Sequence, residues 1–378
     1  MQIDAILLWL TLFFSGMIFL HFALGLGAMR RFPPPLPGEL PGVSVIKPIK
    51  GADPETYLCL ESFCRQRYPG PYEIVFSLQD PEDPALPLLE RLRRNYPEVR
   101  MKITVNPVRR GMSGKTSNLF YGVKEASHPY LVFSDADMRA EPDFVHRLVS
   151  PLLTPATGLS AAVPVHTSGR GLWALLYQLQ LNVTILAQWL PWAKVLPLGV
   201  SGGTLALPRS VLEEIGGVEA FGGFLLDDVK IGLLVREAGY RIELGPALEA
   251  SVGEKAPVDV ISLLSRGAAI YRFMLGALLT VTYLLGAYFY LPVWLVSLVT
   301  LSPSIFAIGW LHLGLKTLAF YLISRFLAGS SGREALYTVV LDGLFLFTFA
   351  KVSLTRRIHW RGMDYTVDKD GRIVPIEG

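Results

Sequence analysis

The chain has 378 residues, of which 51% are hydrophobic and 18% are charged, and its formal net charge is +3. Its mean hydropathy of +0.39 is too high for a soluble domain of this size, so the composition indicates an integral membrane protein. The net charge is small for the length, and no cluster of basic residues typical of nucleic-acid binding is visible. Composition therefore argues against a nucleic-acid-binding protein.

The first apolar segment covers residues 5–29 and contains no charged residue. It is longer than the core of a signal peptide, about 7–15 residues, and long enough for the roughly 20 residues that cross a bilayer. We therefore expect an uncleaved membrane anchor within residues 1–30.

The C-terminal third is also apolar. Residues 273–315 carry no charge, and further apolar runs continue to residue 350, which predicts two to four spans within 273–354. Arg30 and Arg31 follow the first span, and Arg356 and Arg357 follow the last. By the positive-inside rule both flanks are cytoplasmic, so we expect the middle of the chain and the tail at 355–378 in the cytosol.

The middle of the chain begins after a proline-rich stretch at 31–42, which predicts an extended linker. Short apolar strands then alternate with helical patterns, which predicts an α/β domain over 43–272 with a mostly parallel sheet covered by helices on both faces. The expected strands are 43–47, 73–78, 101–105 and 130–133, and the expected helices are 55–67, 84–95 and 115–126.

The only two cysteines, Cys59 and Cys64, lie on one predicted helix. Their five-residue spacing suits neither a zinc site nor a redox pair, so we expect reduced thiols in the core of a cytosolic domain.

Aspartates occur at three places along the predicted domain, hereafter the aspartate stations: Asp80, the Asp-x-Asp (DxD) step of Asp135 and Asp137, and the pair Asp227–Asp228. Ligands of such sheets bind beyond the carboxyl ends of the strands, where Asp80 and Asp135 fall. Two carboxylates at this spacing can converge on one hard divalent cation, which would neutralise a diphosphate. A solvated turn is the alternative for the DxD step.

The other two stations have ordinary alternatives as well. Asp80 precedes a proline and fits a turn. Asp227 and Asp228 begin a predicted helix, where carboxylates interact favourably with the helix dipole. A carboxylate held beside a metal-bound donor could instead deprotonate an acceptor hydroxyl.

Seven ordered blocks of this sequence resemble the membrane-integrated, inverting family 2 glycosyltransferases, within them the ceramide glucosyltransferase-like branch that includes hopanoid-associated bacterial enzymes. The blocks are VSVIKPIKGAD (43–53), SFCRQRYP (62–69), SLQDPEDPA (77–85), GMSGKTSNL (111–119), FSDADMRAEPDF (133–144), GGTLALPRSVLEEIGG (202–217) and LLDDVKIG (225–232). The tail motif WRGMDY (360–365) is similar as well.

The resemblance implies a GT-A type fold that binds a nucleotide sugar, and it implies roles for individual residues. Asp135 and Asp137 would hold the donor diphosphate through Mg²⁺ or Mn²⁺, and Asp228 would be the general base. The implied donor-binding residues are Lys47, Pro48, Asp80, Lys115, Asn118 and Asp135. For Lys115 and Asn118, a helix start with a solvated lysine is the alternative.

One motif departs from the family. Where the family has (Gln/Arg)-x-x-Arg-Trp, this chain has Ala269 to Phe273, so only Arg272 is retained. We carry Arg272 over as a catalytic residue that binds the diphosphate or the acceptor end of the site. Arg266 could contribute instead, and an arginine that merely reaches the membrane interface is a further alternative.

Two apolar segments contain polar residues that need an explanation. Residues 173–198 carry three tryptophans and three glutamines, which predicts a helix in the headgroup layer beside the lipid acceptor, with a buried core helix as the alternative. Asp342 lies in the last apolar run, where an unpaired carboxylate is costly. We expect Lys316 to pair with it.

The predicted function is transfer of a hexose from a UDP-sugar, UDP-glucose or similar, to a membrane lipid hydroxyl such as that of ceramide or a hopanoid. The predicted location is the cell (inner) membrane, multi-pass, with the catalytic domain cytoplasmic. A processive polysaccharide synthase of the same family and a catalytically altered membrane scaffold are the alternatives.

Overall fold

The structure is a computed structural model of the chain. It describes residues 2–29, 40–108, 113–192, 200, 202–274, 276–360, 363–368 and 371–376. Most of the predicted linker at 31–42, together with Arg30 and Arg31, lies outside the described residues. Contacts divide the chain into two units, Arg30–Ser168 with Trp192–Gly253, and Met1–Met29 with Gly169–Pro191 and Glu254–Gly378. The domain boundaries drawn from the sequence stay predictions.

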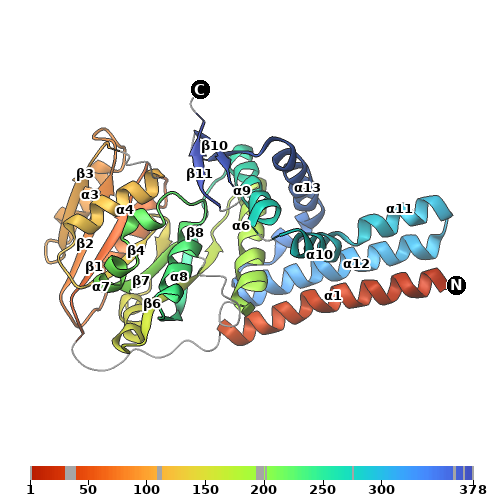
Figure 1. Ribbon diagram of the computed structural model, residues 1–378, viewed down its shortest axis with the longest axis horizontal. Helices are drawn as coiled ribbons and strands as arrows, with labels where there is room; N and C mark the ends of the chain where they lie inside the picture. The colour runs from red at the N-terminus through yellow and green to blue at the C-terminus, as the bar shows by residue number, and fades with distance from the viewer. Residues whose placement is uncertain are drawn as a thin grey trace. The chain divides into compact units, whose positions relative to one another are not determined.

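The first unit, hereafter the sheet unit, is built on eight described strands in the order β3-β2-β1-β4-β7-β6-β8-β5 (Figure 1). The strands are β1 (Val43–Pro48), β2 (Tyr72–Leu78), β3 (Arg100–Val105), β4 (Tyr130–Ser134), β5 (Met138–Arg139), β6 (Thr157–Thr167), β7 (Thr204–Pro208) and β8 (Arg241–Ser251). The helices are α2 (Thr56–Cys64), α3 (Leu86–Asn95), α4 (Gly114–Glu125), α5 (Phe144–Val149), α7 (Arg209–Glu214) and α8 (Asp227–Glu237).

Strands β3, β2, β1 and β4 are parallel to one another, as the strand–helix alternation predicts. Strand β7 then pairs antiparallel with β4, and β6 pairs antiparallel with β7. The carboxyl ends of β1 and β4 therefore meet at one edge of the sheet, where polar side chains from different parts of the chain can gather.

Helices cover both faces of this sheet. Val45 packs in one hydrophobic cluster with Leu60 of α2 and Leu89 of α3. Ile46, the next residue, points to the opposite face, where Gly122 of α4 lies against it so closely that a Cβ there would overlap the isoleucine. Cys59 and Cys64 are buried free thiols on α2, as expected.

The second unit, hereafter the helical unit, contains the long apolar helices. Its helices are α1 (Gln2–Met29), α6 (Leu172–Asn182), α9 (Pro257–Ala269), α10 (Gly276–Tyr288), α11 (Tyr290–Thr300), α12 (Pro303–Leu322) and α13 (Thr338–Thr355). π-Helical turns follow α6, α9 and α12 at Val183–Trp189, Ile270–Met274 and Ile323–Leu327, and a small sheet is formed by β9 (Arg357–Trp360), β10 (Met363–Val367) and β11 (Ile373–Pro375).

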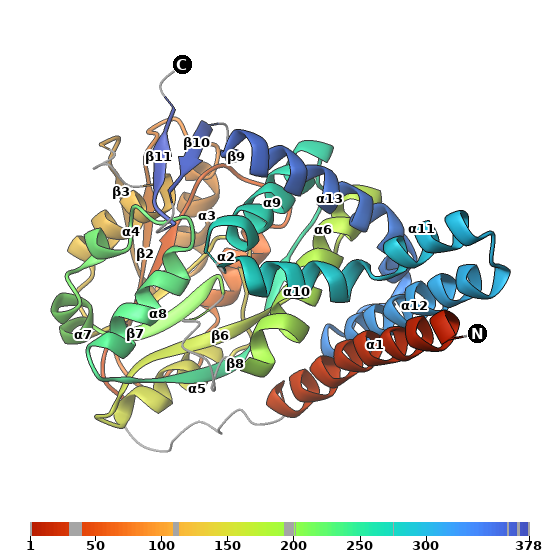
Figure 2. The same cartoon turned by 45° about the vertical axis from the view of Figure 1, so that its right-hand side comes forward.

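Three helical segments among the described residues are long and apolar enough to cross a membrane, namely Ile3–Met29, Pro303–Leu327 and Arg333–Thr355. One is N-terminal and two are C-terminal, which agrees with the predicted count. Helices α1 and α12 lie side by side and run in the same direction (Figures 1 and 2), since Asp4 accepts a hydrogen bond from Ser304 and Ser15 contacts His312 further along both helices.

The predicted pairing of Asp342 is confirmed. Lys316 of α12 places its Nζ 2.7 Å from both carboxylate oxygens of Asp342 on α13. The same Nζ donates to the carbonyl of Ala287 at 2.8 Å, and the Tyr290 hydroxyl donates to Asp342 at 2.9 Å. The ion pair is thus fully supplied with partners inside the helical unit.

The segment predicted to lie in the headgroup layer is helical as far as Trp192, and residues 193–198 lie outside the described residues. Most of its side chains are buried, and it packs against α1 and α9 of the helical unit. Gln178, for example, is 3% exposed, accepts from the Gly169 amide and donates to Glu334. The segment therefore packs within the helical unit, and its place in the headgroup layer stays a prediction.

Candidate active site

The candidate site forms where β4 ends. Ser134 is the last residue of the strand, and the Asp135 backbone N–H donates to the carbonyl of Gly203 at 2.7 Å. Beneath this turn, Lys47 is fully buried at the end of β1, with its Nζ 3.0 Å from the Ser134 hydroxyl and 2.9 Å from the Asp135 carbonyl. Lys47 therefore contacts the site through the backbone of Asp135. Burial lowers the pKa of Lys47 to about 7.

Lys115 joins two of the aspartate stations. It lies in the first turn of α4, which is capped by Ser113 through a hydrogen bond from the Thr116 N–H. Its Nζ is 3.0 Å and 3.2 Å from the two carboxylate oxygens of Asp135 and 3.4 Å from a carboxylate oxygen of Asp227. Burial alone would lower the pKa of Lys115, but Asp135, Asp227 and Asp228 together raise it, so the ammonium stays charged.

Asp228 is held by backbone amides at the start of α8. Its carboxylate accepts from the Gly202 N–H and the Val229 N–H, both at 2.9 Å. Burial and the neighbouring Asp227 raise the pKa of Asp228 to about 6, against the lowering effect of Lys115 and the two amides. A carboxylate that titrates close to neutral pH is suited to accept a proton during a reaction.

Gly202 and Gly203 bring the stations together, and the sequence motifs alone gave them no role. Gly203 accepts from the Asp135 N–H, while Gly202 donates to Asp228. A Cβ on Gly203 would overlap the Met138 side chain and lie 3.2 Å from the Asp135 carboxylate. An alanine at this position would therefore displace the end of the Met138 side chain and crowd the Asp135 carboxylate.

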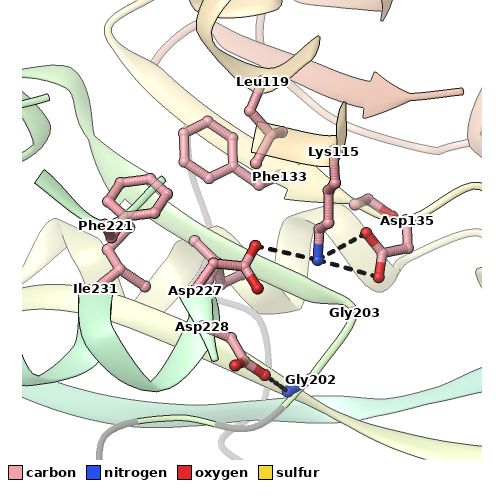
Figure 3. Close-up of a pocket in the computed structure, with 12 residues that line it drawn as sticks. Lys115, Leu119, Phe133, Asp135, Gly202, Gly203, Phe221, Asp227, Asp228 and Ile231 are labelled. Carbon is pink, nitrogen blue, oxygen red and sulfur yellow. Dashed lines mark hydrogen bonds and ion pairs between the residues drawn. The ribbon is translucent and has the colours of Figure 1, made fainter. Parts of the chain in front are cut away.

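These side chains line one pocket, shown in Figure 3, with Lys115 between Asp135 and Asp227 and with Asp228 on Gly202. Phe133, Phe221 and Ile231 form its apolar walls. The cavity volume is about 20 Å³, enough for about one water molecule. The pocket is therefore a narrow cleft whose charged walls are bridged by the lysine.

The other predicted donor-binding residues lie on neighbouring elements of the sheet unit. Asp80 is exposed and accepts from the Glu82 N–H at 2.8 Å, the geometry of a turn. Asn118 is 3% exposed and donates to the carbonyl of Ile49 at 3.1 Å, next to Pro48. Sequence reasoning assigned nothing to Asp83, which is 6% exposed and accepts from the Gly51 N–H, so that it fixes the loop after β1.

The residues proposed for the metal fit a hard divalent cation. Asp135 and the exposed Asp137 offer carboxylate oxygens, and Asp135 already binds a cationic group, the ammonium of Lys115. Within the described ranges no group of three or more His, Cys, Asp or Glu residues could hold a metal ion. Mg²⁺ typically binds to one or two carboxylates and completes its shell with substrate phosphates and water, so two carboxylates suffice.

Arg272 belongs to the helical unit. It lies on the π-helical turn Ile270–Met274 at the end of α9 and is exposed. Arg266, the alternative, lies on α9 itself and is partly buried. The catalytic role of Arg272 stays a prediction, as do the individual roles of the donor-binding residues.

The chain is similar to known glycosyltransferases in sequence and in fold. The family described as glycosyl transferase family 21 matches residues 8–373. Ceramide glucosyltransferase 1 of Caenorhabditis elegans is 29% identical over 230 residues, 60% of this chain and 48% of the relative. Ceramide glucosyltransferase of Komagataella phaffii is 34% identical over 108 residues, 28% of this chain and 21% of the relative. The match thus spans about half the length of the first relative and less of the second.

Among solved structures, the mannosyltransferase PcManGT from Pyrobaculum calidifontis, in complex with GDP-Man and Mn²⁺, is similar with a TM-score of 0.55. The match covers 93% of this chain and 99% of that one at 18% sequence identity, so it shows a shared fold. The predicted GT-A type sheet with flanking apolar helices is confirmed. Because the family match extends over nearly the whole sequence, the chain belongs to glycosyl transferase family 21, and the predicted glycosyltransferase class is confirmed.

Proposed function

We propose that the chain transfers a hexose from a UDP-sugar, UDP-glucose or similar, to the hydroxyl of a membrane lipid such as ceramide or a hopanoid. The observation that carries this proposal is the pocket in which Asp135, Lys115 and Asp228 converge from three separate parts of the chain. The relatives named ceramide glucosyltransferase support the lipid acceptor. The three apolar helices support a reaction at a bilayer.

Asp228 is the proposed general base. It takes the proton of the lipid hydroxyl as that oxygen forms a bond to the anomeric carbon, and the bond from this carbon to the diphosphate oxygen breaks. One direct displacement converts an α-linked donor into a β-glycoside. With a pKa of about 6, the Asp228 carboxylate is ionised near neutral pH and basic enough to accept the proton of the lipid hydroxyl.

Asp135 and Asp137 are the proposed ligands of Mg²⁺ or Mn²⁺. Such an ion, when bound, neutralises charge that develops on the departing nucleotide. Lys115 lies beside Asp135 and supplies a further positive charge that would stabilise the departing diphosphate. Asp80, Asn118 and the loop that follows β1 are proposed to bind the nucleoside, and Arg272 the diphosphate or the acceptor.

The test is incubation of the purified, detergent-solubilised protein with a panel of UDP-sugars and a total membrane lipid extract, followed by mass spectrometry of new glycolipids. We expect a chloroform-soluble product whose mass equals one lipid plus one hexose. A chloroform-insoluble product would identify a polysaccharide synthase instead. Absence of both products and of metal-dependent UDP-sugar hydrolysis would favour the scaffold.

The role of Asp228 is tested by Asp228→Asn, which keeps the shape and one acceptor for the backbone amides. We expect turnover to fall by about 10²–10⁴-fold while UDP affinity is retained. Asp143→Asn is the matched control, because Asp143 also stands at a helix start in the sheet unit and makes no capping hydrogen bond. Unchanged turnover in Asp228→Asn would reject the assignment.

A further inference from the structure

Lys115 contacts both carboxylate oxygens of Asp135, at 3.0 Å and 3.2 Å. A divalent cation that binds Asp135 must take one of these oxygens at about 2.1 Å. It would then stand within a few ångströms of the Lys115 ammonium, and two cations at that distance repel each other. The ammonium and a metal ion would therefore compete for the oxygens of Asp135.

The same pocket needs more room to admit a diphosphate. Its volume is about 20 Å³, and Lys115 bridges the opposite walls formed by Asp135 and Asp227. The backbone of α4 is held at its start, where the Thr116 hydroxyl donates to the carbonyl of Gly222 at 2.8 Å and Ser113 caps the helix. The movable part is therefore the four-carbon side chain of Lys115, which is 17% exposed.

Resting on the proposed function, we propose that Lys115 is an exchangeable counter-cation of the active site. It neutralises Asp135 and Asp227 until the donor arrives, then leaves Asp135 to the metal ion and binds the donor diphosphate. An ammonium on a flexible stem binds phosphate well as a point charge. The consequence is coupling: the metal ion binds weakly alone and tightly together with the donor, because the donor supplies the new partner of Lys115.

The test uses the full-length protein in detergent and two separate binding measurements, Mn²⁺ alone by the loss of its free-ion EPR signal and UDP alone by calorimetry in the presence of a chelator. We expect Lys115→Met to tighten Mn²⁺ binding by about tenfold, because a repelling charge is removed. We expect the same variant to weaken UDP binding by about tenfold, because a phosphate partner is lost.

The opposite signs separate this role from damage to the fold, which would weaken both ligands. Lys124→Met is the matched control, since Lys124 is an exposed lysine on the same helix and this substitution removes the same charge. The effect of UDP on Mn²⁺ binding gives an independent readout. Adding UDP should raise the Mn²⁺ affinity of the wild type more than it raises the Mn²⁺ affinity of Lys115→Met.

Two outcomes would overturn the proposal in different ways. If the wild type binds Mn²⁺ with UDP, and Lys115→Met leaves both affinities unchanged, the exchange role of Lys115 is wrong and the metal-assisted transferase stands. If neither protein binds Mn²⁺ even with UDP, the metal-assisted function fails together with the exchange.

Discussion

Lys316 in the helical unit and Lys115 in the sheet unit both hold aspartates, yet their surroundings differ. The ammonium of Lys316 lies 2.7 Å from both oxygens of one carboxylate, also donates to a backbone carbonyl, and faces the ring of Tyr288; its side chain is 2% exposed. Lys115 is shared between two carboxylates at 3.0–3.4 Å and borders a pocket. A saturated, buried pair fastens helices together, whereas a shared and partly exposed ammonium can change partners.

The largest effect should follow from breaking the Lys316–Asp342 ion pair. Lys316→Met leaves the Asp342 carboxylate buried without its cation, which typically costs about 3–5 kcal/mol. Thermal unfolding in detergent, followed by tryptophan fluorescence, measures the loss. Lys351→Met, on the exposed side of α13, is the control and should change stability by less than about 0.5 kcal/mol.

The proposed difference between the two lysines would be wrong if Lys115→Met destabilised the protein as much as Lys316→Met does. Asp135 and Asp227 are 27% and 15% exposed and border a pocket that is partly open to solvent, so water can replace part of the lost interaction. We expect a cost below about 1 kcal/mol for Lys115→Met.

A second prediction concerns the geometry around Asp135. Gly203→Ala would push the Met138 side chain aside and crowd the Asp135 carboxylate, 3.2 Å from the new Cβ. Displacing a catalytic group by a fraction of an ångström to 1 Å lowers kcat/KM by about 10–100-fold, while stability changes little because Met138 can adapt. Steady-state kinetics with the best UDP-sugar measures this. Gly223→Ala, where a Cβ meets no atom within 4 Å, should retain full activity.

The sequence predicted the four parallel strands β1 to β4 and the Lys316–Asp342 pair for physical reasons. Strands β1 and β4 are buried apolar runs bounded by turn residues, so their position follows from local pattern. Asp342 in an apolar run requires a partner, and Lys316, a lysine flanked by apolar residues like Asp342 itself, supplies it.

The site was predicted less completely. From the sequence, Lys115 looks the same as a solvated lysine at a helix start, and its contact with Asp227 joins residues more than 100 positions apart. The burial of Lys47 and the antiparallel strand β7 had no local signal either. The glycine pair 202–203 lay in a recognised motif, but its role comes only from the three-dimensional approach of Asp135 and Asp228.

The smallest effect is a pH dependence that separates the two lysines. Asp228 must be ionised to accept a proton, and its pKa is raised to about 6, so kcat/KM should fall as pH drops through 6 and should lose about tenfold between pH 7 and pH 5. Lys115 lowers the pKa of Asp228, so Lys115→Met should move the midpoint to higher pH, even though its maximal activity is reduced. Lys316→Met, assayed below its unfolding temperature, should leave the midpoint unchanged, because Asp342 and not Asp228 is its partner. Equal shifts in both variants would mean that the midpoint reports overall stability and not the charge beside Asp228.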